Sequence, residues 1–342
     1  MRTVLICLVV SVLAIISWFA LWRPQPGSVE LWCAHDAVYA EQVVAAFTTA
    51  TGIPVVVRYD SEATKSLGLV ERLARDGGRD CDVFWNNEIL GTLSLAQAGR
   101  LAPHLGDGWQ RSSLRDPSGR WTGFGARLRV AAVHPPKLAA EEAAVAAFWR
   151  GPLGDAAMAK PIYGTTLTQC AVLWQVLGEA GFAAWHDAAL ARGLRLVDGN
   201  SATRDLAAAG TVALGLTDTD DAVSAVAAGK PLVMLPLRLG MLADVPADQA
   251  KRTIVIPNTV AVMKDCRHPD TARQLADFIA SAAVEVMLAH SAAQVPLGPV
   301  DDAALPPTIR PLRAWAADAV DLTGLLPARD ACLVWLKARH GL

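Results

Sequence analysis

The chain has 342 residues and a mass of 36.2 kDa, enough to bury a large core and to form two lobes. Hydrophobic residues make up 53% of the chain and charged residues 19%, which excludes an intrinsically disordered protein. With 31 basic and 33 acidic side chains the formal net charge is -2, so the charge balance gives no reason to expect a nucleic-acid partner.

Residues 1–27 contain the clearest local signal. Met1-Arg2 is followed by Thr3–Trp22, a run of 20 residues without a charge. Twenty helical residues span about 30 Å, the thickness of a bilayer core, and Arg2 favours the cytoplasmic side. The segment is therefore either a signal anchor that crosses the inner membrane through residues 3–22 or a cleaved signal peptide. Both alternatives place the rest of the chain in the periplasm.

Strand and helix patterns alternate in the next hundred residues, and the β-branched runs and glycine stops define them. The predicted strands are Val29–Cys33, Ile53–Tyr59 and one that contains Val83–Trp85, and the predicted helices begin at Asp36 and Ser61 and end at Gly52, Gly77 and near Gly99. Such β-α-β-α-β alternation predicts a parallel sheet with helices on both faces.

The same alternation returns in the middle of the chain and predicts a second α/β unit. Its predicted elements are a strand that ends in Pro161–Gly164, a helix capped by Thr165 or Thr166, strands at Leu194–Val197, Val212–Leu216 and Leu232–Leu237, and a helix that opens at Asn200. Helical patterns follow at Thr271–Leu288 and around Leu312–Leu342.

Two extended stretches, Trp121–Val133 and Thr253–Met263, connect the two units. We therefore expect a hinged, two-lobe α/β fold of the periplasmic-binding-protein type, with a ligand cleft between the lobes. The expected division is 28–125 with 258–300 for lobe 1, and 126–257 with 301–342 for lobe 2.

Ligands of open α/β sheets bind beyond the carboxyl ends of the strands. Polar or aromatic residues occur at these ends in both expected lobes, and Arg127 lies on the first connection. The candidate ligand-binding residues are Asp36, Ser61, Glu62, Trp85, Asn87, Glu88, Arg127, Thr165, Thr166, Asn200, Asp218, Thr219, Asp220 and Asp221.

Several candidates have an alternative, purely structural interpretation. Facing carboxylates favour a cation between them, which makes Glu62, Asp218 and Asp220 candidate metal ligands; alternatively, Asp220 or Asp221 caps the next helix. The helix starts at Thr165 and Asn200 attract anions, or are ordinary caps. Buried core packing is the simpler explanation of Trp85, and Arg127 pairs either with an anionic ligand or with a structural carboxylate.

The chain resembles the solute-binding proteins of ABC importers, in the group that includes ferric-iron-binding proteins. The order of several short segments carries this resemblance over Val29–Leu342: Phe47–Ile53, Cys81–Trp85, Leu95–Pro103, Gly125–Val130, Asn200-Ser201 and Ile256–Val262. The resemblance implies a two-lobe fold that closes on a ligand, and partners in a membrane permease and its ATPase.

The resemblance also assigns ligand positions one at a time. It matches the family's histidine to His35 or Asp36, its glutamate to Glu62, and its anion-holding helix start to Gly164-Thr165-Thr166, supported by Asn200. Where the ferric-binding relatives carry a Tyr-Tyr pair, this chain has Thr219-Asp220. The missing phenolates argue against Fe(III) and for another metal ion, an amine or an amino-phosphonate-like zwitterion.

The expected function is therefore a monomeric importer receptor that needs no cofactor but accommodates a bound metal ion. One alternative is a membrane-tethered sensing or accessory protein, and the other is a hydrolase with Cys33 beside His35. The sequence contains no G-x-S-x-G, no H-E-x-x-H, no Walker loop and no G-x-G-x-x-G, which argues against an enzyme. Outside the first segment the chain has Cys33, Cys81, Cys170, Cys266 and Cys332, without a C-x-x-C pair, and buried thiols are expected.

Overall fold

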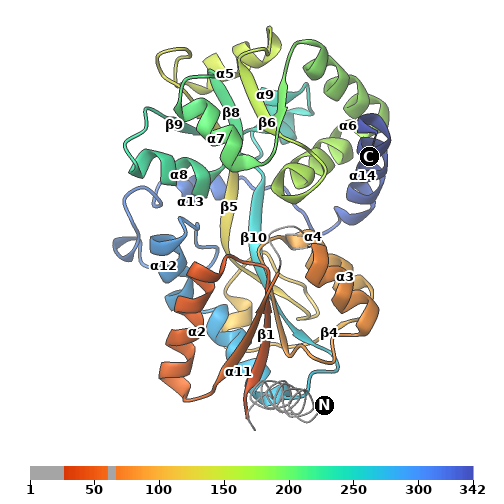
Figure 1. The fold of residues 1–342 in the computed structure, drawn as a ribbon, viewed down its shortest axis with the longest axis vertical. Helices are drawn as coiled ribbons and strands as arrows, with labels where there is room; N and C mark the ends of the chain where they lie inside the picture. Colours follow the sequence, from red (N-terminus) through yellow and green to blue (C-terminus); the bar gives the residue numbers. More distant parts are fainter. Residues whose placement is uncertain (1–26, 61–66, 342) are drawn as a thin grey trace, which may run out of the picture.

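Two long strands, β5 (Thr122–Val133) and β10 (Val255–Met263), run from one lobe into the other (Figure 1). The computed structural model describes residues 27–60 and 67–341, which form an α/β lobe at each end of these strands. β5 pairs with β10 as far as Leu128, with β8 from Arg129 onward and with β9 from Val130 onward. The expected lobe boundaries at 125/126 and 257/258 fall in β5 and β10, and they stay a prediction.

Lobe 1 is built on a sheet of order β2-β1-β3-β10-β5, with β4 beside β10. Its strands are β1 (Val29–Cys33), β2 (Val55–Tyr59), β3 (Val83–Asn86) and β4 (Leu101–Ala102). Its helices are α2 (Ala37–Thr51), α3 (Leu67–Asp76), α4 (Ile89–Gln97), η1 (Asp107–Gln110), α11 (Pro269–Ile279) and α12 (Ala282–Ser291). Every residue of β1 and β3 is buried, as expected of strands covered on both faces.

Lobe 2 continues the sheet as β5-β8-β6-β7, with β9 on β5. Its strands are β6 (Ala156–Ala159), β7 (Arg195–Val197), β8 (Leu214–Asp218) and β9 (Val233–Pro236). Its helices are α5 (Glu142–Arg150), α6 (Gly164–Ala191), α7 (Asn200–Ala208), α8 (Thr219–Ala227), α9 (Leu239–Leu242) and α10 (Ala247–Ala250).

The last part of the chain returns to lobe 2. It contains η2 (Asp302–Ala304), α13 (Leu312–Ala316) and α14 (Leu326–His340). α14 lies along α6 (Figure 1), where the rings of Trp335 and Trp174 approach to 6.3 Å between centroids. The chain end therefore packs on the lobe that carries Asp218, Thr219, Asp220 and Asp221, which we call the acidic turn.

Several element predictions need correction. The parallel pairing is confirmed for β1, β2 and β3 and for β6, β7 and β8, but the two strands that join the lobes pair antiparallel. Pro161–Gly164 does not end a strand, because β6 stops at Ala159. Thr165 and Thr166 do not cap α6, since the helix begins at Gly164 behind Tyr163 and both threonines lie within its first turn.

Two predictions concern residues outside the described part of the chain. Ser61 and Glu62 lie there, and the described part of the second helix, α3, begins at Leu67. The expected membrane segment, residues 3–22, lies there as well. Within residues 27–60 and 67–341, no helix has the length and apolar character that a membrane crossing needs.

Candidate functional site

Arg129 and Asp218 form a fully buried ion pair at the inner edge of lobe 2. The two residues stand opposite each other in the antiparallel pairing of β5 with β8, so their side chains meet directly. Nη1 of Arg129 donates to Oδ1 of Asp218 at 2.8 Å, and both side chains are almost completely buried. A charge pair at this depth persists only when its remaining hydrogen-bonding groups are satisfied.

Neighbouring side chains and one backbone carbonyl provide the hydrogen bonds that this buried pair needs. Arg129 also donates to Oε1 of Gln169 (2.9 Å), Oγ1 of Thr165 (3.3 Å), Oδ1 of Asn200 (3.1 Å) and the carbonyl oxygen of Leu216 (3.2 Å). Oδ2 of Asp218 accepts from Oγ1 of Thr165 at 2.7 Å and from Nδ2 of Asn200 at 2.8 Å. Oγ1 of Thr166 donates to Oδ1 of Asn200 at 3.4 Å. We call Arg129, Asp218, Thr165, Asn200 and Gln169 the buried network; it joins β5, β8, α6 and α7.

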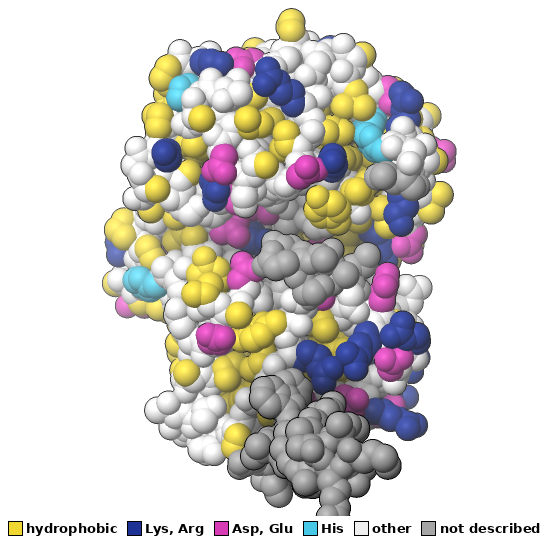
Figure 2. Space-filling view, in the orientation of Figure 1, with side chains coloured by type: hydrophobic (Ala, Val, Ile, Leu, Met, Phe, Trp, Pro, Cys, Tyr) yellow, Lys and Arg dark blue, Asp and Glu magenta, His cyan; other side chains and the backbone are white. Residues whose placement is uncertain are grey.

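Arg127 lies two residues earlier on β5 and therefore on the same face of the strand. Its contacts to the acidic turn are much looser, because Nη1 is 4.0 Å from Oδ2 of Asp218 and 4.0 Å from Oδ2 of Asp220. Its Nη2 donates to the carbonyl oxygen of Asn87 in lobe 1 at 2.6 Å. Arg127 thus links the two lobes and keeps 16% of its side chain exposed. Charged side chains of both signs gather at this junction (Figure 2).

Asp220 is the carboxylate of the turn that the buried network does not use. Within the described residues, its Oδ1 is buried and has no hydrogen-bond partner, although 34% of the side chain is exposed. Burial raises the pKa of Asp220 to about 7; Arg127 opposes this rise, and the charges of Asp218 and Asp221 add to it. A positive group brought to Oδ1 would relieve this unfavourable ionisation.

The other two residues of the turn have structural roles. Oγ1 of Thr219 accepts from the backbone N–H of Leu128 at 3.2 Å, at the point where β5 changes lobe. Asp221 accepts from the hydroxyls of Ser201 (3.1 Å) and Thr217 (3.2 Å). Asp218 holds the N-cap position of α8 without a side-chain cap bond, so neither Asp220 nor Asp221 is the cap.

Lobe 1 presents His35 and Tyr39 to the same junction. Nδ1 of His35 accepts from the backbone N–H of Asp36 at 2.8 Å, while Nε2 is buried and lacks a partner in the described chain. Burial and, to a smaller extent, the nearby charge of Arg127 lower the pKa of His35 to about 4, so the ring is neutral. The pKa of Tyr39 is raised by burial and by the charges of Asp36 and Asp220. Asp36 itself is exposed.

Glu88 and Thr168 make a second contact between the lobes. Glu88 caps α4 by accepting from the backbone N–H groups of Leu90 (2.8 Å) and Gly91 (3.3 Å). Its Oε1 also accepts from Oγ1 of Thr168 on α6 at 3.2 Å. Burial raises the pKa of Glu88, and the donors oppose the rise. The adjacent Trp85 is fully buried in the core of lobe 1.

The sequence-based prediction missed four residues of this site: Arg129, Gln169, Thr168 and Tyr39. A signal for Arg129 exists in Ala126–Val130, where two arginines at a spacing of two interrupt an apolar strand and must share one face. The position of Thr168, one turn into α6, is a sequence feature that could have pointed to it. The sequence near Gln169 does not indicate its role, because its partner Arg129 is 40 residues away.

A three-carboxylate metal site fits this arrangement poorly. Ligand oxygens of Asp218, Asp220 and Asp221 lie within 4.8 Å of one another, close enough to surround one ion. However, Asp218 already accepts three hydrogen bonds shorter than 3.0 Å, and Asp221 accepts from two hydroxyls. An ion would have to displace these donors, which leaves Asp220 as the carboxylate available to a ligand.

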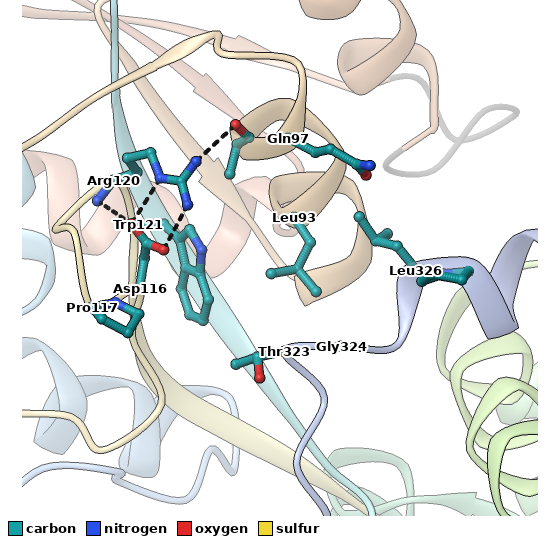
Figure 3. A pocket seen from close by; sticks show the side chains of 11 residues that line it. Leu93, Gln97, Asp116, Pro117, Arg120, Trp121, Thr323, Gly324 and Leu326 are labelled. Atoms are coloured by element: carbon teal, nitrogen blue, oxygen red, sulfur yellow. Dashed lines mark hydrogen bonds and ion pairs between the residues drawn. The ribbon is translucent and has the colours of Figure 1, made fainter.

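Two pockets in the described chain lie outside this site. One, of about 550 Å³, lies between α4, residues 116–121 and residues 323–327 (Figure 3). The other, of about 510 Å³, lies between residues 113–114, 296–297 and 313–323. In the first, the ionic groups of Asp116 and Arg120 bind each other at 2.9 Å. Neither pocket contains a predicted site residue, and the walls of the first leave no charge unpaired for a charged solute.

The chemistry of Cys33 excludes the hydrolase alternative. Its thiol is completely buried and points to the carbonyl oxygen of His35 at 3.8 Å, not to the imidazole. Burial raises the pKa of Cys33 to about 12, so it does not form the thiolate that a cysteine nucleophile needs. Cys81, Cys170 and Cys332 are also buried free thiols, and Cys266 is half-buried.

Residues 34–291 match the family of bacterial extracellular solute-binding proteins. The chain belongs to this family. Its members bind substrates and are not enzymes, and a location outside the cytoplasm follows from the family. A search of curated protein sequences finds no match.

Solved structures share the fold at low identity. Iron-bound HitA from Pseudomonas aeruginosa has 20% identity and a TM-score of 0.74, and the ferric binding protein from Campylobacter jejuni has 18% and 0.72. The periplasmic binding protein AfuA from Actinobacillus pleuropneumoniae, with exogenous fructose-6-phosphate bound, has 16% and 0.70. Each comparison covers 92% of this chain and 99% of the other. The two-lobe fold and the resemblance to ferric-binding proteins are thereby confirmed.

Proposed function

We propose that the chain is the periplasmic receptor of an ABC importer and that it captures a small charged solute between its lobes. The observation that carries this proposal is the buried Oδ1 of Asp220, which lacks a partner in the described chain and lies beside Arg127. A solute with a positive group at Asp220 and a negative group at Arg127 would satisfy both.

This arrangement favours a zwitterion, such as an amino-phosphonate, or an amine over a bare metal ion. One carboxylate oxygen and a neutral imidazole are few ligands for an ion that prefers several oxygens. The guanidinium of Arg127, 4.0 Å from Asp220, also repels any cation that carries no negative group, so a zwitterion fits better than a simple amine. An ammonium group needs only acceptors, and an attached phosphonate would pair with Arg127.

The proposed solute would favour closure of the two lobes, because its contacts come from both of them. Asp220 belongs to lobe 2, His35 to lobe 1, and Arg127 reaches Asn87 across the junction. A solute that touches all three binds the closed form better and shifts the population toward it. The closed form would then dock on a permease driven by a cytoplasmic ATPase, as this family typically does.

The test is a thermal-shift screen followed by calorimetry with Fe³⁺, Zn²⁺, putrescine, 2-aminoethylphosphonate and fructose 6-phosphate. We expect one zwitterion or amine to stabilise the protein, and D220N to weaken its binding by tenfold or more. D248N, an exposed carboxylate change on α10, is the matched control and should bind normally. Equal binding by D220N and the wild type would refute the site, and loss of solute uptake on gene deletion tests the importer role.

A further inference from the structure

Two histidines meet where α6 and α14 end on lobe 2, away from the start of α6 that joins the buried network. Nε2 of His186 on α6 lies 3.2 Å from Nε2 of His340 on α14. The ring centroids are 5.2 Å apart and the ring planes cross at 78°. The two Nε2 atoms therefore lie next to each other, although they come from two different helices.

Asp187 sets the tautomer of His186. Oδ1 of Asp187 lies 3.2 Å from Nδ1 of His186 and also accepts from Nε of Arg339 at 2.8 Å. A carboxylate only accepts hydrogen bonds, so Nδ1 carries the proton and Nε2 keeps its lone pair. A carboxylate behind the distal nitrogen is also the usual arrangement for a metal-binding histidine.

The position of His186 is fixed by aromatic packing. The ring of Trp335 contacts it edge-on at 5.1 Å and that of Phe182 lies 6.0 Å away, and 2% of the side chain is exposed. His340 is half-buried, which leaves access from solvent. Burial lowers the pKa of both imidazoles, so both are neutral at pH 7 and available as ligands.

We propose that His186 and His340 bind a late first-row divalent metal ion, with Zn²⁺ as the reference, through their Nε2 atoms. With a Zn–N distance of about 2.05 Å, a nitrogen separation of 3.2 Å gives an N–Zn–N angle of about 103°, close to tetrahedral. Imidazole suits zinc, copper and nickel. The ion takes the place of the hydrogen bond between the two nitrogens. His186 already has its proton on Nδ1, and the proton on Nε2 of His340 moves through solvent to Nδ1 of the same ring, so both imidazoles stay neutral. Water completes the coordination, and α14 becomes tied to α6.

The experiment is calorimetric titration of the chelator-treated full chain with ZnCl₂ at pH 7.5, with wild type, H340A, H290A and D220N. We expect one site with a micromolar Kd in the wild type, at least tenfold weaker in H340A. H290A removes an exposed histidine on α12 and should leave this site intact, as should D220N in the cleft. His186 is not substituted, because its ring packs in the core of lobe 2.

A second readout identifies the ligands. Cu²⁺ bound to the wild type should show an electron paramagnetic resonance spectrum split by two imidazole nitrogens, reduced to one or none in H340A. Zinc that binds H340A as tightly as the wild type, or no binding at 100 µM zinc, would overturn the proposal. Binding lost in D220N but kept in H340A would also overturn it and would assign the ion to the cleft.

Discussion

Arg127 and Arg129 stand two residues apart on the same face of β5, yet they differ in almost every contact. Arg129 is fully buried and makes five hydrogen bonds of 2.8–3.3 Å within lobe 2. Arg127 stays 4.0 Å from the same acidic turn and makes its one short bond to the other lobe. Arg129 therefore stabilises lobe 2, whereas Arg127 remains available to a ligand in the cleft.

The same contrast separates the carboxylates of the turn. Asp218 is neutralised by Arg129, while Asp220 has an oxygen without a partner among the described residues. A cluster of acidic residues therefore does not identify a metal site by itself. The number of donors that each carboxylate already has decides which one a ligand can reach.

The largest expected effect is on stability, from R129M. Methionine fills the space but leaves the buried carboxylate of Asp218 unpaired, which costs about 3–5 kcal/mol in the free energy of unfolding. Urea denaturation measures this loss. The double variant R129M/D218N removes both charges and should recover much of it; a loss below about 1 kcal/mol in R129M would show that the network is not structural.

R127Q should show the opposite pattern. Its ion-pair contacts at 4.0 Å contribute about 1 kcal/mol or less to stability, and its hydrogen bond to the carbonyl oxygen of Asn87 adds about 0.5–1.5 kcal/mol. A solute with a negative group should bind at least tenfold more weakly. Urea denaturation measures the change in the free energy of unfolding, and calorimetry with the solute identified by the screen measures the change in Kd. If R127Q destabilises the protein as much as R129M does, the two arginines do not divide these roles.

The pKa of Asp220 predicts opposite trends for stability and binding with pH. The folded ligand-free protein holds a proton on Asp220 up to about pH 7, whereas in the unfolded chain the carboxyl releases it near its ordinary pKa of 3.8. Stability contributed by this group therefore falls as the pH rises from about 4 to 7. Affinity for a cationic group rises between pH 6 and 8, because ionised Asp220 attracts it.

Thermal unfolding and calorimetry across this pH range measure both trends. D220N should remove most of each, since the amide does not titrate. A wild-type affinity that is independent of pH would mean that Asp220 does not contact the positive group.

The smallest expected effect comes from T168V, which removes the hydrogen bond to Glu88 between the lobes. Such a bond contributes about 0.5–1.5 kcal/mol, so the closed form should become a few-fold less populated. Small-angle scattering at fixed solute concentration should show a larger average dimension. T203V removes a hydrogen bond of similar burial within lobe 2, from Oγ1 of Thr203 to the carbonyl oxygen of Gly199, and should leave closure unchanged.

Local sequence patterns predicted the elements well because their causes are local. The apolar run Val29–Cys33 forms a buried strand, and Gly52 ends α2 in the left-handed conformation, with φ of 72°. The helix start after β6 was misplaced, because Pro161 to Tyr163 form a turn that looks β-like in isolation.

The site was only partly predictable for a different reason. The sequence placed Asp218, Asp220, Thr165 and Asn200 at neighbouring strand ends, and the structure brings them together. It could not rank the carboxylates, since Arg129 reaches Asp218 only through the register of β5 on β8, 89 residues away in sequence. Ser61 and Glu62 lie outside the described residues, and their role stays a prediction.

The backbone amide of Leu128 has an unusual partner. It marks the point where β5 leaves one sheet for the other, and its hydrogen is held by the hydroxyl of Thr219 instead of a neighbouring strand. Because β5 crosses between the lobes at this residue and Thr219 belongs to the expected lobe 2, we expect opening and closing of the lobes to act on this bond. The rate of hydrogen–deuterium exchange at the amide of Leu128 should therefore report opening and closing of the lobes, and it should fall while a solute is bound.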